Sequence, residues 1–322
     1  MTALTIGARS WDHVIPIALG DAPGSEFTTL ERRDLTPNIW NEAGLDGSET
    51  SLSSYVRARA AGDDSVTALP VFIMRGFRHR CIITRKDSPL ETAADLAGTR
   101  IGLTGWPDSG NTWTRAILRR EGVGIADAEW RVGALTAAHP IQDRMGGVEA
   151  PPTVAPTEND EPMVEMLARG ALDAVMTPFA PPGFYELDSP FRTLYRDNQA
   201  AERNWFDTTG YIPGIHVLAV KTAVLEADPA AAQRLVDVFA AAQTLSYQRR
   251  AKMLDVTPWQ NDAFESATAA FGDDFSPIGW NANATMVADF QTELVEQGLM
   301  AAPLAATDLF PYAVEVSDAA RA

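Results

Sequence analysis

The segment from residue 75 to residue 86 concentrates positive charge in a way that could bind an anion. It contains five cations and no acid, namely Arg75, Arg78, Arg80, Arg85 and Lys86. A guanidinium group can hold a planar carboxylate through two hydrogen bonds. The apolar residues in between, Phe77 and Ile82–Ile83, should be buried, so some of these cations must leave a strand near its end, where pockets form. A run of solvated charges is the alternative interpretation.

Three histidines stand where they could transfer a proton. His216 interrupts an otherwise apolar strand, and His13 follows the first predicted strand. His79 lies between Arg78 and Arg80, which should depress its pKa and keep it neutral near pH 7. The alternative for His216 and His79 is a structural role in the core. His139 begins a predicted loop, where we expect it to be solvated.

A third motif joins a predicted strand to a helix through the polar, glycine-containing loop Gly102–Thr112. Helix N-termini bind anions because they present free N–H groups and partial positive charge. Ser109, Asn111 and Thr112 could therefore cap the helix or contact a carboxylate, and Arg115 could add a full charge one turn further on. The spacing matches neither a dinucleotide-binding fingerprint nor a P-loop.

Other chemistries receive little support from the sequence. A metal held by His13, His79 and His216 is a weaker alternative, because no two of them have short ligand spacing. The single cysteine, Cys81, excludes an intrachain disulfide and a multi-cysteine metal site, and we expect it to be buried in a strand. There is no Gly-x-Ser-x-Gly motif for a serine nucleophile.

The net charge restricts the partners. With 26 basic and 43 acidic side chains, the formal charge is 26 − 43 = −17. This sign argues against nucleic acid and against anionic membrane surfaces. No run of about 18 apolar residues predicts a membrane span. The single cysteine and an N-terminus without signal-peptide features predict a cytoplasmic protein. The sequence leaves homo-oligomerisation open.

Short β-branched runs alternate with helical patterns, which predicts a parallel α/β architecture. The predicted strands are Leu4–Gly7, Glu26–Leu30, Val66–Pro70, Cys81–Thr84, Arg100–Thr104, Glu129–Val132, Ala171–Met176 and Ile215–Val220. The predicted helices are Ser51–Ala61, Asn111–Glu121, Glu161–Arg169, Pro229–Met253, Ala263–Phe271 and Thr285–Gln297. Residues 138–161 and 177–190 read as long connections.

The order of these elements predicts two α/β lobes joined by two crossings, with a helical C-terminal tail that returns to the first lobe. Lobe 1 comprises residues 1–84 and 215–322, and lobe 2 comprises residues 85–214. A ligand would then bind in the cleft between the lobes, near the carboxyl ends of the strands.

Several runs in order along residues 3–320 resemble the 4,5-dihydroxyphthalate decarboxylase family, which has the fold of type II periplasmic binding proteins. The specific ones are Phe77-Arg78-His79-Arg80 and Pro213-Gly214-Ile215-His216, supported by Glu49–Tyr55, Asn111–Leu118 and Leu172–Ala174, whereas Asp95-Leu96-Ala97-Gly98 is shared more widely. The family usually has Pro-Ile-Met-His where this chain has a glycine at 214. Because that glycine removes a side chain beside the expected site, the substrate could differ from 4,5-dihydroxyphthalate.

The resemblance implies cofactor-independent, non-oxidative decarboxylation of a hydroxylated aromatic acid, so the partner is a small aromatic carboxylate. On this interpretation His216 donates the proton to the ring, and His79 or Glu49 polarises the ring hydroxyl. Carboxylate binding falls to Arg78, Arg80 and Arg115, with contacts from Ser109, Asn111, Thr112 and His13. Trp113 or Phe77 would stack on the ring, unless they pack in the core.

Two other functions fit the same fold and the same arginines. One is a solute-binding protein that captures a small anionic aromatic ligand for an ABC-type transporter. The other is a sensor of aromatic acids without catalytic activity. The Arg-His-Arg and Pro-x-x-His runs favour the enzyme.

Overall fold

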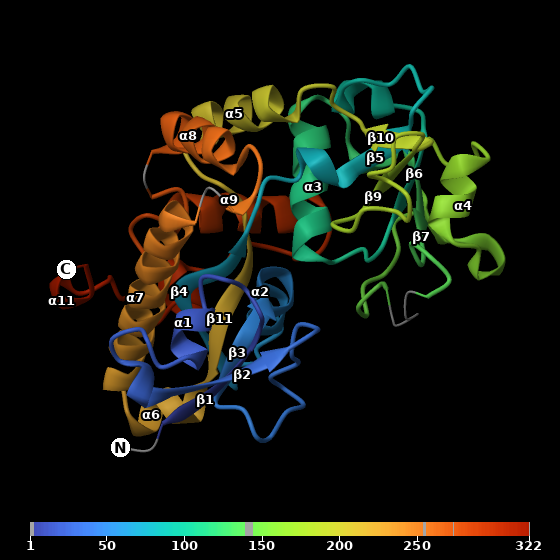
Figure 1. Ribbon diagram of the computed structural model, residues 1–322. Helices are drawn as coiled ribbons and strands as arrows, with labels where there is room; N and C mark the ends of the chain where they lie inside the picture. Colours follow the sequence, from blue (N-terminus) through green and yellow to red (C-terminus); the bar gives the residue numbers. More distant parts are fainter. Residues whose placement is uncertain (1–2, 139–143, 254–255, 273, 322) are drawn as a thin grey trace. The chain divides into compact units, whose positions relative to one another are not determined.

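A computed structural model describes the chain except for residues 1–2, 139–143, 254–255, 273 and 322 (Figure 1). The chain forms two compact units. Unit 1 consists of Met1–Gly76, Gly214–Gln291 and Ala302–Ala322, and unit 2 consists of Phe77–Pro213 and Thr292–Ala301. Residues 77–84 belong to unit 2 rather than to the predicted lobe 1, because residues 82–84 are part of a strand that pairs within the sheet of unit 2.

Unit 1 contains a five-stranded mixed sheet in the order β2-β1-β3-β11-β4 (Figure 1). Its strands are β1 (Leu4–Arg9), β2 (Thr28–Arg33), β3 (Gly47–Ser51), β4 (Val66–Arg75) and β11 (Gly214–Lys221). Strand β1 runs parallel to β2 and β3, whereas β11 runs antiparallel to β3 and β4. Strands β1, β3 and β4 therefore end at the edge of the sheet where β11 begins.

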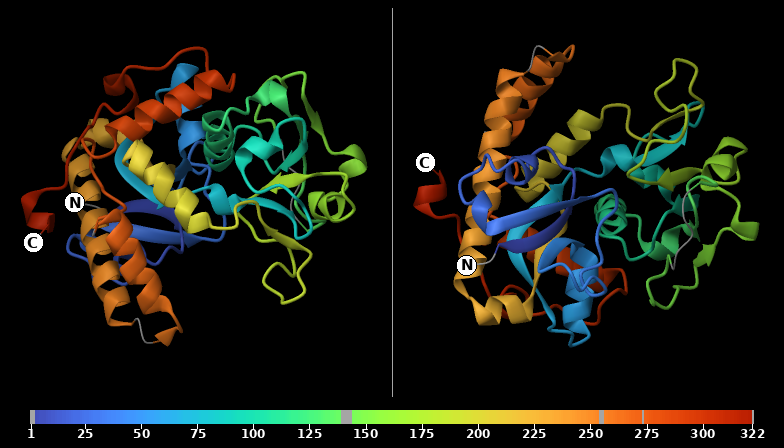
Figure 2. Two further views of the ribbon diagram at one scale, coloured as in Figure 1. Left: turned by 90° about the horizontal axis from the view of Figure 1, so that it is seen from above. Right: turned by 60° about the horizontal axis from the view of Figure 1, so that its bottom comes forward.

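Helices cover this sheet and build its core. They are α1 (Ile15–Ala18), α2 (Leu52–Ala60), α6 (Thr222–Ala227), α7 (Ala230–Lys252), α8 (Gln260–Phe271), most of α9 (Ala284–Glu296), α10 (Ala306–Leu309) and α11 (Asp318–Arg321). Figure 2 shows α7, in light orange, lying along the sheet. Leu235, Val238 and Phe239 of α7 pack against Leu69 and Leu218 of the sheet. The spacing of apolar residues in the sequence predicted this buried face correctly.

Unit 2 contains a six-stranded mixed sheet in the order β10-β5-β9-β6-β7-β8. Its strands are β5 (Ile82–Arg85), β6 (Arg100–Leu103), β7 (Glu129–Val132), β8 (Val154–Pro156), β9 (Ala174–Met176) and β10 (Phe191–Thr193), and its helices are α3 (Ser109–Arg120), α4 (Met163–Ala168) and α5 (Asn198–Thr209). Strands β9, β6, β7 and β8 are parallel, whereas β5 runs antiparallel to β9 and β10.

The α/β class is confirmed, but the expectation of purely parallel sheets is wrong. In each unit, one strand supplied by a distant part of the chain runs antiparallel between two others. Strand β3 was not predicted because its sequence, Gly-Ser-Glu-Thr-Ser, is polar. Strands β8 and β10 were not predicted because they are short. Among the described residues, no helix is long and apolar enough to cross a membrane.

Candidate functional site

A buried carboxylate on the central strand of the unit 1 sheet contacts three other side chains. Glu49 of β3 is completely buried. Its Oε1 accepts hydrogen bonds from Arg9 Nε (3.0 Å) and Nη2 (2.7 Å), and lies 2.6 Å from Nδ1 of His216. Its Oε2 accepts from the Arg9 backbone N–H (2.9 Å) and from Trp11 Nε1 (3.0 Å). Both oxygens are therefore occupied by protein donors.

The charge state of Glu49 determines which nitrogen of His216 can exchange a proton. Burial opposes ionisation, but hydrogen bonds and charges from His216 and Arg9 outweigh it and lower the pKa of Glu49 to about 2. Nδ1 lies 2.6 Å from this ionised carboxylate and 2.8 Å from Nη2 of Arg9, so it faces both an acceptor and a donor. A proton on Nδ1 satisfies the shorter of the two contacts, and Arg9 Nη2 then donates to Glu49 Oε1. The His216 side chain is 14 % exposed, and no described residue bonds to Nε2. Nε2 is therefore the ring atom available to a ligand.

An irregularity in β11 gives His216 its orientation. The pairing of β11 with β4 shifts register on both sides of His216, opposite Met74. Bulges of this kind re-aim side chains and are common beside functional sites. Gly214 lies two residues earlier, and a Cβ there would come within 2.6 Å of Phe72 and 2.8 Å of Met286. Phe72 and Met286 therefore occupy the space beside this glycine, and a substrate other than 4,5-dihydroxyphthalate stays a prediction.

The loop after β1 completes this group. The Arg9 guanidinium lies 4.4 Å from the centre of the Trp11 ring. The His13 ring is stacked with the same Trp11 ring, with centroids 6.5 Å apart. His13 Nε2 donates to the carbonyl of Ile73 at 2.8 Å. Asp12 pairs with Arg250 of α7, and hydrogen bonds from His13 and Arg250 lower the pKa of Asp12. The loop is thus fastened to the sheet and to α7.

In unit 2, the first turn of α3 and the neighbouring Arg78 form a group of polar donors without acceptors in the described part of the chain, called the cradle below. The N–H groups of Gly110 and Asn111 precede the first intrahelical bond and have no acceptor among the described residues. Arg78 is only 4 % exposed and lies so close that a Cβ on Gly110 would be 2.7 Å from its Nη2. Within the described chain, Arg78 Nε and Thr112 Oγ1 are buried without partners. A carboxylate would satisfy these groups.

The charge balance around α3 favours an anion as well. Burial lowers the pKa of Arg78, Arg115 and Arg144, that of Arg115 to about 9, but each guanidinium remains charged at neutral pH. The charge of Asp108, at the N-cap position of α3, acts in the opposite direction and raises the pKa of all three guanidinium groups. Of the three, only Arg115 is also influenced by a second acid, Glu293. Positive charge therefore exceeds negative charge here, and the helix dipole adds to the excess.

Arg115 and Trp113 serve the packing of unit 2 rather than an open surface. Arg115 donates to Gln297 Oε1 (2.8 Å) and to the Trp106 carbonyl (2.7 Å), and its guanidinium lies 4.1 Å from the centre of the Trp106 ring. Trp113 is completely buried and packs against Trp205 and Tyr211. The structure therefore places Trp113 in the core, the second of the two alternatives left by the sequence.

The side chains of the other predicted residues are exposed, buried in packing or bonded elsewhere. Arg80 is exposed, whereas Phe77 and Cys81 are buried. Ser109 is 2 % exposed at the start of α3, and Asn111 donates to the Gly105 carbonyl at 2.7 Å. His139 lies outside the described residues. No group of three or more His, Cys, Asp or Glu side chains arranged to hold a metal occurs in the part of the chain that the structure describes.

His79 occupies an aromatic cage distinct from the position of Arg78. Its ring is 4 % exposed and lies edge-on to Tyr195 and Trp205, at 5.3 and 6.0 Å between centroids. Burial lowers the pKa of His79 to about 4, which confirms the predicted direction but not the predicted cause, the neighbouring arginines. His79 lines a cavity of about 480 Å³ beside Ile117 and Arg120, in the second half of α3.

Arg9 and Trp11 are not among the residues predicted from the sequence. The predicted first strand ends at Gly7, whereas β1 continues to Arg9. The available signal was the run Arg9-Ser10-Trp11-Asp12-His13, which brings a cation and an aromatic ring directly after a buried strand. The carboxyl ends of such strands are common ligand sites in α/β folds.

Solved structures define the class of this fold. The aliphatic sulphonate binding protein SsuA of Escherichia coli aligns with 98% of this chain and 94% of its own, with 15% identity and a TM-score of 0.58. The desulfurization enzyme DSZB aligns with 95% of this chain and 96% of its own, with 18% identity and a TM-score of 0.54. The chain therefore has the two-unit α/β fold of solute-binding proteins, which an enzyme also uses.

Sequence comparison is more specific, although no profile of a known protein family matches the chain. A 4,5-dihydroxyphthalate decarboxylase of Comamonas testosteroni is 29% identical over 95% of this chain and 96% of its own length. One of Pseudomonas putida is 32% identical over 65% of this chain and 83% of its own length. The chain belongs to the 4,5-dihydroxyphthalate decarboxylase family.

Proposed function

We propose that the protein removes carbon dioxide from a hydroxylated aromatic carboxylic acid, without a cofactor. The observation that carries this proposal is the Glu49–His216 pair: a fully buried carboxylate lies 2.6 Å from Nδ1, which favours a proton on that nitrogen and leaves Nε2 available. A redox-neutral decarboxylation needs such a proton donor, because a C–H bond must replace the broken C–C bond. Family membership supports the same class of reaction.

In this mechanism His216, in its imidazolium form, donates the Nε2 proton to the ring carbon that bears the leaving carboxylate. The bond from this carbon to the carboxylate then breaks, its electron pair restores the aromatic ring, and carbon dioxide leaves. His216 regains its proton from water. A hydroxyl group ortho or para to this carbon assists by donating electron density.

Glu49 acts in this proposal as a positioning residue. Its two oxygens are occupied by Arg9, Trp11 and His216, which leaves neither for a substrate hydroxyl. Arg9 compensates the charge of Glu49 and holds the carboxylate plane in which His216 is aligned. Polarisation of the hydroxyl by His79 stays a prediction.

Carboxylate binding is assigned to unit 2. Arg78 supplies the charge, and the N–H groups of Gly110 and Asn111 supply directed donors at the start of α3. A carboxylate that remains on the product would bind here without reacting, so this group would contribute to affinity more than to the chemical step.

Capture of an aromatic anion for a transporter is the second candidate function. The observation that favours it is the likeness of the fold to a sulphonate-binding protein. The same fold occurs in a desulfurization enzyme, so fold alone does not decide between binding and catalysis. We further propose a cytoplasmic location, supported by the single cysteine; fractionation of the source cells tests it.

A carbon dioxide release assay separates the two functions. The purified protein is incubated with benzoates and phthalates that differ in the number and position of hydroxyl groups, and release is followed beside ligand binding by calorimetry. We expect release from at least one hydroxylated acid and none from the unsubstituted acids. Tight binding without release across the whole panel would support the binding protein and contradict the decarboxylase.

A further inference from the structure

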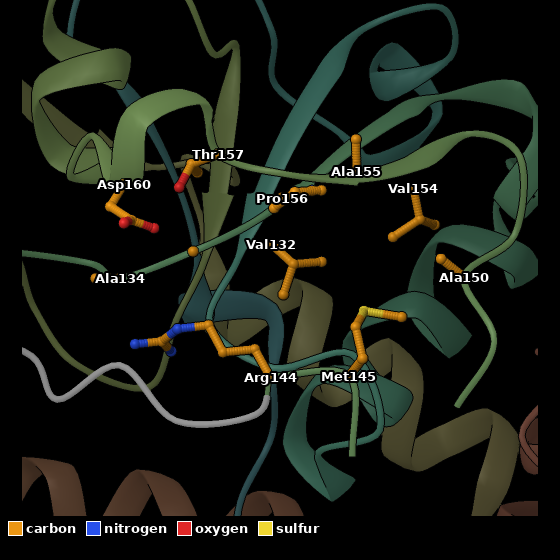
Figure 3. Close-up of a pocket in the computed structure, with 11 residues that line it drawn as sticks. Val132, Ala134, Arg144, Met145, Ala150, Val154, Ala155, Pro156, Thr157 and Asp160 are labelled. Atoms are coloured by element: carbon orange, nitrogen blue, oxygen red, sulfur yellow. The ribbon is translucent and has the colours of Figure 1, made fainter. Parts of the chain in front are cut away.

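A second region of unit 2 has the form of a ligand site. It contains none of the residues used above for proton transfer, and it shares only Arg144 with the positive charge around α3. It is a cavity of about 320 Å³ at the carboxyl ends of β7 and β8 (Figure 3). Val132 ends β7, Val154 and Pro156 belong to β8, and Met145 and Ala150 close the opposite side. Ligands of α/β sheets bind at this edge, beyond the carboxyl ends of parallel strands.

The walls of the cavity are mainly apolar, and the backbone fixes them. Figure 3 shows Val132, Met145 and Val154 facing the cavity from different segments. The Thr157 N–H donates to the Val132 carbonyl at 3.1 Å, and the Thr157 side chain covers Gly133 so closely that no Cβ fits there. A cavity of this size is at the lower end of the range for small-molecule sites, about 300–1,000 Å³, and suits a single ring.

Polar groups occur on one side of the cavity only. Arg144 is held there by two backbone bonds: its Nη1 donates to the Thr104 carbonyl at 2.5 Å, and its own carbonyl accepts from the Trp106 N–H at 2.8 Å. Figure 3 shows Arg144 and Asp160 on the same side, away from Val154. An anchored cation and a carboxylate next to an apolar wall match a ring that carries an acid group and a hydroxyl group.

Arg144 also connects the cavity to the carboxylate cradle. Thr104 and Trp106, which it contacts, belong to the loop that leads from β6 into the first turn of α3. Asp108 in that loop acts electrostatically on both Arg144 and Arg78. An anion bound at Arg144 would therefore change the field at the cradle.

We propose that this cavity is a second binding site for a hydroxylated aromatic acid, separate from the group that transfers the proton: Arg144 binds a carboxylate, Asp160 accepts from a ring hydroxyl, and the apolar wall contacts the ring. The inference rests on the proposed function for the class of ligand. It adds that a molecule of this class binds in unit 2 to residues that take no part in proton transfer.

Calorimetry with benzoate, 4-hydroxybenzoate, phthalate and succinate tests this assignment in the full-length protein. Ala150→Phe fills the cavity from an exposed position, and Arg144→Gln removes the cation. The matched controls are Ala126→Phe, at another exposed position of unit 2, and Arg131→Gln, which removes a cation paired with Glu129. We expect both cavity variants to weaken binding of the aromatic acids about tenfold or more, with the controls unchanged and succinate bound weakly throughout.

The outcomes distinguish this inference from the decarboxylase proposal. Loss of binding in the two cavity variants, when the wild type releases no carbon dioxide, would support the inference and contradict the decarboxylase. Normal binding in both cavity variants, when the wild type is active, would overturn the inference and leave the decarboxylase intact. Absence of aromatic acid binding by the wild type, or equal loss in the controls, would also overturn the inference.

Discussion

The two units share one strand arrangement but place different chemistry on it. Unit 1 has the order β2-β1-β3-β11-β4, and in unit 2 the order β7-β6-β9-β5-β10 repeats it in the directions of all five strands, with β8 added outside β7. In each unit, the strand that runs antiparallel comes from a distant part of the chain. The scaffold alone therefore cannot explain why the units differ.

The difference arises at the ends of corresponding strands. In unit 1, β1 is followed by the Arg9–His13 loop and by the four-residue helix α1; in unit 2, β6 is followed by α3, which has 12 residues. Glu49 occurs on the third strand of unit 1, whereas the third strand of unit 2 is Ala174-Val175-Met176. One end thus carries the buried Glu49–His216 pair, and the other carries the N-terminus of a long helix, which is a typical anion site.

On the proposed function, two copies of one topology would have different tasks, binding in unit 2 and proton transfer in unit 1. A long helix offers N–H groups and a dipole, which suit a charge that does not change during the reaction. A bulge in a strand redirects a side chain, and the neighbouring strands hold it in place. This suits a group that must deliver a proton. Variants in unit 1 should therefore change kcat, and variants in unit 2 should change affinity.

The largest effect is expected from His216→Asn in unit 1. Asparagine keeps a polar side chain but cannot donate a proton of suitable pKa, so kcat should fall by about 10²- to 10⁴-fold. The dissociation constant of a non-reacting aromatic acid, measured by calorimetry, should stay within about threefold of the wild type. An unchanged kcat, or a loss of activity explained wholly by weaker binding, would contradict the assignment of proton transfer to unit 1.

Glu49→Gln should lower the stability of unit 1. The substitution leaves the partly buried charge of Arg9 without its fully buried partner, which should reduce the free energy of unfolding by about 2–3 kcal/mol. The matched control Glu31→Gln breaks a half-exposed pair with Arg33 and should change it by less than about 1 kcal/mol. Urea unfolding measures both; equal values would show that burial of the pair has no energetic consequence.

The lowered pKa of Glu49 also determines in which direction the free energy of unfolding changes with pH. It is lowered from 4.5 to about 2, so the stabilisation is complete above about pH 4.5 and is lost as the pH falls towards 2. Glu49→Gln should remove this part of the acid sensitivity. An identical slope in the variant between pH 4.5 and 2 would contradict the assigned ion pair.

His79→Phe should change the acid sensitivity of unit 2 at a higher pH. The pKa of His79 is lowered from 6.5 to about 4, so the unfolded chain binds its proton more readily. Wild-type stability should therefore decrease as the pH falls from 6.5 to 4, by up to about 3 kcal/mol. Phenylalanine fits the aromatic cage and should remove this decrease in urea titrations at pH 7 and pH 5. A variant that keeps the full decrease would show that His79 remains charged in the fold.

Much of the fold follows from the sequence because its core segments are periodic. The strands at residues 100–103, 129–132 and 214–221 and the helices at 109–120 and 230–252 all lie within about two residues of their predicted positions. The apolar run of α7 could face only the sheet. Strand β3 could not be predicted, because its Ser and Thr side chains are buried in hydrogen-bonded contacts that only the folded sheet provides.

The candidate site was only partly predictable, for a related reason. Arg78 and His79 are adjacent in sequence, yet one contacts the first turn of α3 and the other faces its second half. Spacing along the chain cannot separate such neighbours. The partnership of Glu49 with Arg9 and His216 joins residues 40 and 167 positions apart, and sheet pairing alone creates it.

The smallest effect, and the sharpest test of unit 2, comes from Arg78→Gln. Glutamine retains a hydrogen-bond donor but removes the charge, so the dissociation constant of an aromatic carboxylate and its KM should rise by about 10- to 100-fold, with kcat changed by less than about threefold. The control Arg196→Gln removes an exposed cation of the same unit, paired with Glu91, and should leave both constants unchanged. The same affinity loss in the two variants would indicate general attraction by charge, which added salt would abolish. A loss confined to Arg78→Gln that persists in high salt would instead place the carboxylate at the buried first turn of α3, where the N–H groups and the guanidinium act together.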